Sequence, residues 1–258
     1  MQIIQAFAVK NKCYQAGAPL YPQGIMLHSV GCAQPSAAVF ARSFNQYQPG
    51  GVSVCVHAFA QADGTVYQTL PWEMRGWHCG GSANSTHIGV EMTEPSAGMT
   101  RSEAAEQIAG TTRSEAAEQI AGTYRTVVEL FAELCKQYEL DPAQDGVIIG
   151  HAEGHRRGVA SNHADPELLW RTYDMGYTMD GFRRDVAEAM KNGAREEALD
   201  MPRYDSVAEM PQWARAGVQR LIDRGALQGN TDGKLDVSED MIRTMIVCQR
   251  MLDEQRET

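Results

Sequence analysis

The sequence predicts an α/β (α+β) fold, in which helices pack on a central β-sheet, followed by a small helical C-terminal module. Short apolar runs bounded by turn residues alternate along residues 1–191 with segments whose apolar residues recur at helical spacing. This interleaving is typical of helices packed on a sheet. The 258 residues, 43% of them hydrophobic, suffice for one domain of ordinary size and a small appendage.

Five apolar runs are expected to form strands. The first, Gly24–His28, ends on a histidine. The second, residues 52–59, leads into the sequence Gln-Ala-Asp-Gly at 61–64, which is typical of a hairpin turn, so its partner is expected at residues 65–70. The last two strands are expected at 87–92 and 146–151.

Four segments carry apolar residues at helical spacing and are expected to form helices. They are residues 124–138, 182–190, 213–222 and 241–252, the last capped by Ser238. The charged stretch between the second and third helices holds few large apolar residues, which favours a linker. We therefore predict a domain at 1–191, a linker at 192–203 and a small helical module at 204–258.

One twelve-residue segment occurs twice, since Thr100–Thr111 is repeated without change as Thr112–Thr123. Solenoid repeats have longer periods and at least three copies, so the pattern indicates a duplication. Each copy contains good helix formers but ends in Gly-Thr, which favours a helix stop. We expect the extra copy to lengthen the approach to the helix at 124–138 on the protein surface.

Charge and composition exclude several classes of function. The formal net charge of −10 disfavours nucleic-acid binding, because the protein would repel phosphate. No run reaches the ~18 apolar residues of a membrane span, and the first residues lack the basic and apolar regions of a signal peptide. The six cysteines form no C-x-x-C pair, which is typical of free thiols in a reducing compartment. We expect a protein made in the cytoplasm, without membrane insertion.

Three polar groups at or just beyond expected strand ends are candidate metal ligands. They are His28, His151 and the segment Ser161–Pro166, which contains the carboxylate of Asp165. Two histidines and a carboxylate match the ligand preference of zinc, with a fourth position left open for water. A competing pair is His151 with His155, but the string His-Ala-Glu-Gly-His is not H-E-x-x-H, and its glycine disfavours a helix there.

Several segments, read in order, resemble the amidase-2 family of N-acetylmuramoyl-L-alanine amidases, which includes phage endolysins, autolysins and peptidoglycan recognition proteins. The similarity covers about residues 20–175. It rests on Gly-Ile-Met-Leu-His-Ser at 24–29, Asp-Gly-Thr-Val-Tyr-Gln at 63–68, Gly-Trp-His-Cys-Gly at 76–80, His-Ile-Gly-Val-Glu at 87–91, Gly-His at 150–151 and His-Ala-Asp-Pro at 163–166. The resemblance implies a mixed central sheet flanked by helices, with zinc at one edge.

Residue by residue, the resemblance implies that His28, His151 and Asp165 bind Zn²⁺. It implies that Glu91 acts as the catalytic acid–base on the attacking water. A positioned carboxylate can take the proton of water and pass it to the leaving amine.

The resemblance also implies that Trp77 and His78 line the substrate groove. The residue two positions before the last ligand is often lysine in the family, where it steadies the oxyanion. Here it is His163. This departure puts the identity of the electrophilic residue in question, and His163 keeps the catalytic role if it donates a hydrogen bond.

The implied reaction is zinc-dependent hydrolysis of the amide bond between N-acetylmuramic acid and L-alanine in bacterial peptidoglycan. The implied setting is a phage or prophage endolysin that reaches the wall after phage-mediated release. Two alternatives are a non-catalytic peptidoglycan-binding protein of the same fold and an amidase that recycles soluble muropeptides. Residues 211–252 loosely resemble a surface-layer-homology-type wall-binding repeat, and the alternative for this module is a homodimerisation element.

Overall fold

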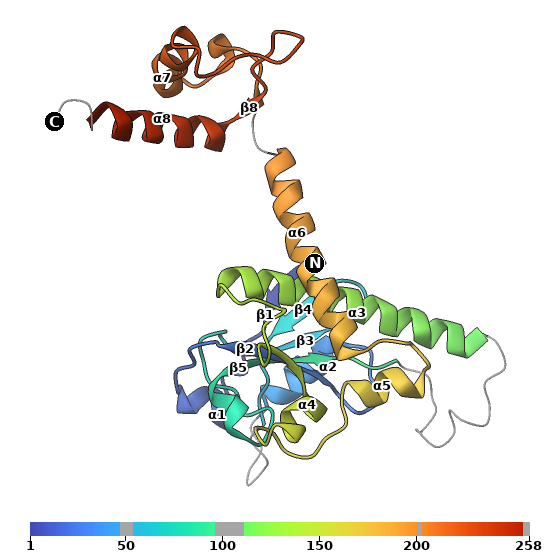
Figure 1. The fold of residues 1–258 in the computed structure, drawn as a ribbon. Helices are drawn as coiled ribbons and strands as arrows, with labels where there is room; N and C mark the ends of the chain where they lie inside the picture. The colour runs from blue at the N-terminus through green and yellow to red at the C-terminus, as the bar shows by residue number, and fades with distance from the viewer. Residues whose placement is uncertain (47–53, 96–110, 201–202, 255–258) are drawn as a thin grey trace. The chain divides into compact units, whose positions relative to one another are not determined.

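A computed structural model describes residues 1–46, 54–95, 111–200 and 203–254 (Figure 1). The chain divides into two compact units, Met1–Lys191 and Asn192–Thr258. Within the first unit, helices flank a mixed β-sheet, as the sequence predicts. None of the helices in the described ranges combines the length and apolar character that crossing a bilayer would need.

The sheet has six strands in the order β1-β4-β3-β5-β2-β6. All neighbours are parallel except β3 and β4, which form the expected antiparallel hairpin. The strands are β1 (Gln2–Gln5), β2 (Gly24–Ser29), β3 (Ala58–Ala60), β4 (Thr65–Gln68), β5 (His87–Met92) and β6 (Ile148–Gly150). The sequence did not predict β1, a four-residue edge strand that is mostly exposed and so lacks a marked apolar pattern.

Two expected strands differ in extent. Residues 52 and 53 lie outside the described residues, and within 54–59 the chain makes an isolated bridge from Cys55 to Trp77 before β3 begins at Ala58. The run expected at 146–151 pairs only as β6, because His151 already begins helix α4. In both places apolar residues remain buried beyond the last paired residue. The apolar run alone therefore predicts a strand that is too long.

The helices of the first unit surround this sheet. They are α1 (Lys12–Ala16), α2 (Ala37–Phe44), α3 (Thr111–Gln137), α4 (His151–Arg156), α5 (Glu167–Thr172) and α6 (Met179–Asp200), with a 3₁₀ turn at Ser82–Ser85. The sequence analysis did not identify α1, α2, α4 and α5, which have only five to eight residues. A helix that short shows barely two turns of apolar periodicity.

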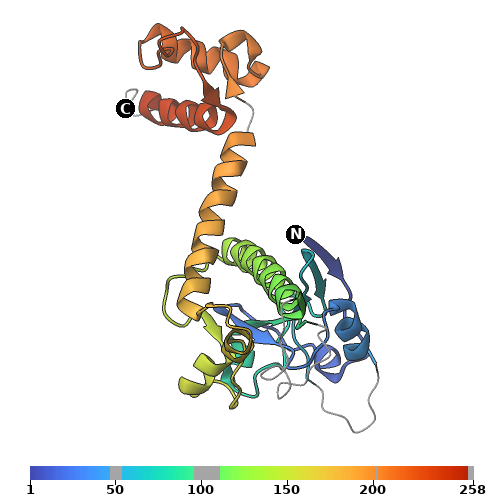
Figure 2. The ribbon, with the colours of Figure 1, turned by 90° about the vertical axis from the view of Figure 1, so that its right-hand side faces the viewer.

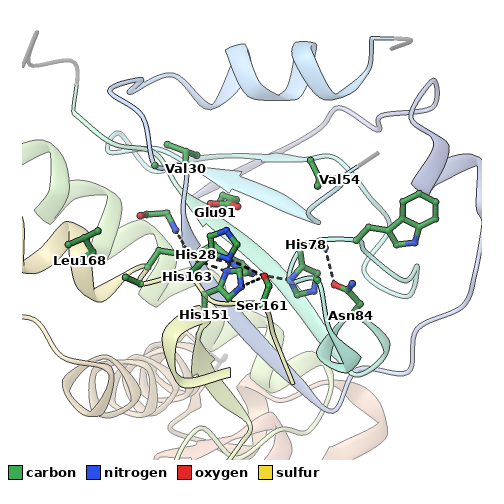
Figure 3. Close-up of a pocket in the computed structure, with 16 residues that line it drawn as sticks. His28, Val30, Val54, His78, Asn84, Glu91, His151, Ser161, His163 and Leu168 are labelled. Atoms are coloured by element: carbon green, nitrogen blue, oxygen red, sulfur yellow. Dashed lines mark hydrogen bonds and ion pairs between the residues drawn. The ribbon is translucent and has the colours of Figure 1, made fainter. Parts of the chain in front are cut away.

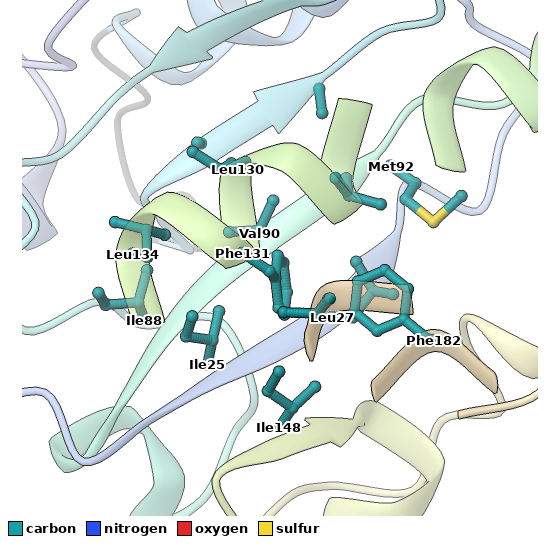
Figure 4. Packing of buried hydrophobic residues seen from close by; sticks show 14 of the residues in the cluster. Ile25, Leu27, Ile88, Val90, Met92, Leu130, Phe131, Leu134, Ile148 and Phe182 are labelled. Carbon is teal, nitrogen blue, oxygen red and sulfur yellow. The ribbon is translucent and has the colours of Figure 1, made fainter. Parts of the chain in front are cut away.

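Alternation along β2 and β5 divides the sheet into two faces. Ile25, Leu27, Ile88 and Val90 point to one face, where they join the main core with α3 and α6 (Figure 4). Figure 2 shows α3 lying along the sheet. Because successive side chains of a strand point to opposite faces, the intervening residues point away from α3. The second face is therefore where the polar end of β2 emerges.

The second copy of the duplicated segment belongs to the core. Helix α3 begins at Thr111, and Ile120 is fully buried in the main cluster. A Cβ at Gly122 would lie 2.6 Å from the carbonyl oxygen of Ala62, so this glycine permits the close approach of α3 to the β3–β4 hairpin. The expectation that this copy only lengthens a surface approach is wrong, because it supplies the first turns of α3. The first copy, except Thr111, lies outside the described residues.

The second unit contains a small apolar core of its own. Its elements are β7 (Arg203–Tyr204), a 3₁₀ turn at Val207–Glu209, α7 (Gln212–Asp223), β8 (Val237–Ser238) and α8 (Glu239–Glu254). Val218 of α7 packs with Ile242 and Ile246 of α8, and the Ser238 hydroxyl accepts a hydrogen bond from the Met241 amide, as expected of a cap. Residues 192–200, expected as linker, are helical and form the end of α6.

The packing of the second copy can be tested by truncating its buried side chain. Ile120→Ala should lower the free energy of unfolding by about 2–5 kcal/mol, because it leaves a cavity in the main core. Glu118→Ala, two residues away and exposed, is the matched control and should change stability by less than about 0.5 kcal/mol. Urea unfolding measures both, and equal stability of the two variants would contradict the burial of this copy. Deleting a whole copy is less informative, since either deletion yields the same polypeptide.

Candidate active site

The site forms where β2, β5 and β6 end. Parallel pairing of β2 with β5 sets His28 opposite Glu91, and pairing of β2 with β6 sets Leu27 opposite Gly150, directly before His151. These strands run in the same direction, so their carboxyl ends meet at one edge of the sheet, where open α/β sheets bind ligands. His28, Glu91 and His151 thus come together, although His28 and His151 are 123 positions apart in sequence.

His28, His151 and Asp165 form a compact ligand cluster (Figure 3). The Nδ1 atoms of the two histidines lie 3.0 Å apart. The Asp165 carboxylate lies 3.3 Å from Nδ1 of His28 and 3.5 Å from Nδ1 of His151. Both imidazoles are buried, whereas Asp165 is partly exposed. The structure therefore brings together the three ligands that the sequence analysis selects.

The donor set fits a tetrahedral zinc ion. Ligand bonds of ~2.0–2.1 Å at tetrahedral angles place neighbouring donor atoms roughly 3.3 Å apart, which matches the three separations. Burial lowers the pKa of His28 below its usual value, so the imidazole is neutral and offers a lone pair. Burial opposes ionisation of Asp165, but the neighbouring imidazoles of His151 and His28 outweigh it and hold the pKa of Asp165 below the usual range. Two neutral imidazoles and a carboxylate are the protonation states that zinc requires.

Glu91 lies beside the cluster and lines the same cavity. Its Oε2 is shielded from solvent and has no hydrogen-bond partner among the described residues. Burial, followed by the charges of Asp165 and Glu94, raises the pKa of Glu91 well above its usual value. A buried carboxyl group with an unused oxygen is typical of a proton-transfer residue in a cleft.

The cavity has a volume of about 650 Å³ and includes the other predicted site residues. Trp77 and His78 form part of its wall, and His163 is exposed at its rim. The His163 ring lies 4.5 Å from that of His151, centroid to centroid. Apolar side chains complete the lining, among them Val30, Val54 and Leu168 (Figure 3).

Three polar residues that the sequence analysis did not single out hold the site in place. Ser161 contacts both His151 and His163. Asn84 accepts hydrogen bonds from the backbone amides of residues 78 and 79 through Oδ1. Glu94 accepts hydrogen bonds from the Ser29 hydroxyl and the Gly31 amide and so fixes the loop after β2. Their sequence contexts carry no signal, because each acts through contacts distant along the chain.

The remaining histidines are structural. His57 is fully buried, accepts a hydrogen bond from the Gly89 amide at Nδ1 and donates from Nε2 to the Met74 carbonyl. Burial lowers the pKa of His57 to about 4, so this imidazole is neutral in the core. His87 is also buried, and its Nε2 donates to the Gly146 carbonyl.

The segment 151–156 forms helix α4, so the expectation that its glycine disfavours a helix is wrong. A Cβ at Gly154 would lie 2.9 Å from Cε of Met26 and 3.0 Å from Cβ of Ala160, so glycine permits the close packing of α4 on β2. His155 is exposed on this helix and takes no part in the ligand cluster. The cluster uses Asp165 instead, from the loop that follows α4.

Solved structures share this fold. The Staphylococcus aureus hydrolase AmiA, determined in complex with its ligand, is 18% identical in sequence, with a TM-score of 0.54 over 75% of this chain and 86% of that chain. PlyL is 16% identical, with a TM-score of 0.50 over 72% of this chain and 97% of that chain. Comparison of the sequence with curated proteins finds no match.

The family model described as N-acetylmuramoyl-L-alanine amidase matches residues 18–168, more than half of the chain. The matched range contains β2, β5 and β6, the three ligand candidates and Glu91. The family accounts for both the mixed sheet and the polar cavity at its edge. The chain thus belongs to Amidase_2, the family of peptidoglycan amidases.

Proposed function

We propose that the protein hydrolyses the amide bond between N-acetylmuramic acid and L-alanine in peptidoglycan, with zinc held by His28, His151 and Asp165. The observation that carries the proposal is the convergence of these three ligands with Glu91 in one cavity. A peptidoglycan-binding protein without catalysis would need neither the ligand set nor a shielded carboxyl group beside it.

A bound zinc ion supplies Lewis acidity, which lowers the pKa of water from ~15.7 towards ~7 and polarises a carbonyl. Glu91 takes the proton of the attacking water and passes it to the leaving nitrogen of L-alanine. Its raised pKa suits both steps, because the carboxyl group must hold the proton between them.

His163 is proposed to donate a hydrogen bond from Nε2 to the oxygen of the scissile carbonyl as negative charge develops there. This role requires a proton on both ring nitrogens, because Nδ1 donates to the Ser161 hydroxyl. Its place at the cavity rim, beside the ring of His151, supports this role. Trp77 and His78 are proposed to contact the substrate from the cavity wall, with the apolar side chain of Val54 nearby.

The C-terminal unit is proposed to bind the cell wall, with homodimerisation as the alternative. Trp213 is partly exposed on α7, and the guanidinium of Arg243 lies 4.6 Å from the centre of its ring. An exposed aromatic ring flanked by a cation is suited to glycan or peptide contact. Tethering to the wall would raise the local concentration of a polymeric substrate.

We infer a biological role as a phage or prophage endolysin, released from the cytoplasm to the wall during lysis. The resemblance to a family that includes endolysins supports it. The alternative is recycling of soluble muropeptides inside the cell. Lysis of producing cells only after their inner membrane is permeabilised would support the endolysin, whereas turnover of soluble fragments without attack on intact wall would support recycling.

The reaction is tested by digesting purified peptidoglycan with and without a chelator. Mass spectrometry should find new N-terminal L-alanine and no new reducing sugar ends, and chelation should abolish cleavage. His28→Ala should lose both metal and activity, because two ligands do not make a closed zinc site. His155→Ala, in the same fold but outside the cluster, is the matched control and should retain about one zinc per chain. Undiminished cleavage by metal-free protein would disprove the zinc mechanism.

The role of Glu91 is tested by removing its charge while keeping its shape. Glu91→Gln should bind zinc normally and reduce turnover by about 10²–10⁴-fold, the usual contribution of a general acid–base group. The exposed Glu118→Gln on α3 is the control for loss of one carboxylate. A near-normal rate for Glu91→Gln, measured on a soluble muropeptide, would return this residue to a structural role.

The C-terminal unit is tested by ending the chain after Asp200, which keeps α6 whole. The shortened protein should cleave a soluble muropeptide at the rate of the full chain, because the main core uses no residue beyond Met190. Loss of binding in a pull-down with insoluble wall would support wall targeting. A change from dimer to monomer in light scattering, with wall binding intact, would support dimerisation instead.

A further inference from the structure

We infer that His78 and Ser161 are positioning residues: through one hydrogen-bond network they hold His28 and His151 in the tautomer that leaves Nδ1 free for the metal. The inference rests on the proposed zinc site and assigns its supporting residues. It follows from the identity of each donor and acceptor, since a carbonyl oxygen can only accept a hydrogen bond.

The first branch runs through His78. Its Nε2 lies 3.1 Å from the His87 carbonyl oxygen, so Nε2 carries the proton and donates it. A neutral imidazole carries one ring proton, so with Nε2 as the donor the Nδ1 of His78 can only accept. That Nδ1 lies 2.9 Å from Nε2 of His28, which must therefore be the donor. His28 is left with an unprotonated Nδ1, the atom that faces the other two ligands.

The second branch runs through Ser161. Its hydroxyl lies 3.0 Å from the Cys79 carbonyl oxygen and donates its only proton there. The same oxygen lies 3.2 Å from Nε2 of His151 and so accepts a hydrogen bond from it. His151 is likewise left with an unprotonated Nδ1. The hydroxyl also lies 3.0 Å from Nδ1 of His163, which orients the ring at the cavity rim (Figure 3).

Both branches start from the dipeptide His78–Cys79, which is held rigidly. Asn84 Oδ1 accepts from the backbone amides of both residues, at 2.9 and 3.0 Å. The His78 ring lies directly over Gly89 of β5, where a Cβ would be 2.5 Å from Cγ of the ring. The Ser161 amide adds a 2.8 Å hydrogen bond to the Cys79 carbonyl. One short segment therefore orients both metal-binding imidazoles, and second-sphere groups of this kind fix ring orientation and tautomer.

The roles of the two residues differ from direct ligation. Neither His78 nor Ser161 belongs to the ligand cluster. Their removal should weaken the metal site without dismantling it, since all three ligands remain. Loss of an outer-shell partner typically costs about 10–100-fold in metal affinity.

The test uses the full-length protein and measures zinc affinity by competition with a chromophoric chelator. His78→Phe keeps a ring but removes the acceptor, and Ser161→Ala removes only the hydroxyl. Each should raise the zinc dissociation constant by about 10–100-fold. His78→Asn restores an acceptor near the position of Nδ1 and should recover part of the loss. His155→Phe, outside the network, is the matched control and should bind zinc as the unaltered protein does.

A second measurement reads the tautomers directly in metal-free protein by two-dimensional ¹H–¹⁵N NMR of the histidine rings. His28 and His151 should both carry the proton on Nε2. In His78→Phe, only His28 should lose this preference, so that part of its population carries the proton on Nδ1. A proton on Nδ1 of either residue in the unaltered protein, or unchanged zinc affinity in both His78→Phe and Ser161→Ala, would overturn the inference. If the unaltered protein binds no zinc, the proposed function fails, while the tautomers still decide the network. If His78→Phe does not fold, the zinc affinity of Ser161→Ala decides the test.

Discussion

The parallel pairing of β2 with β5 is the interaction on which the site depends. Its register sets His28 beside Glu91, and alternation along the strands turns both away from the core under α3. The apolar residues that alternate with His28 along β2 and with Glu91 along β5 are buried on the other face. A slip of one residue would bury polar side chains and expose apolar ones, so hydrophobic burial also fixes the positions of His28 and Glu91.

Polar groups at this edge are arranged for a cation. Two imidazole lone pairs and a carboxylate converge within 3.5 Å of one another, an arrangement that is costly without positive charge between them. The supporting hydrogen bonds to His78 and Ser161 point the lone pairs inwards. The proposed metal would therefore also stabilise this region, because an ion that binds only the folded site favours the folded state.

The site also shows why glycines recur around it. The backbone of β5 at Gly89 approaches the His78 ring, and α4 at Gly154 approaches β2. At Gly89 a side chain would occupy the space of the His78 ring, and at Gly154 it would meet Met26 and Ala160. Glycine has a low intrinsic propensity for helix and strand, but the free energy of tertiary packing outweighs this unfavourable contribution. The dense packing explains how a short dipeptide can orient two ligands.

The strands β2, β4 and β5, the β3–β4 hairpin, the helices α7 and α8, and the residues around the cavity could all be predicted from the sequence. Those features follow from local apolar periodicity, turn chemistry and ordered family motifs. Tertiary structure alone decided the strand order, the edge strand β1, the short helices and the supporting contacts of Ser161, Asn84 and Glu94. It also decided that Ile120, in one of two identical copies, is buried. The burial of Ile120 depends on the space available against the sheet, which the local propensity of its segment does not encode.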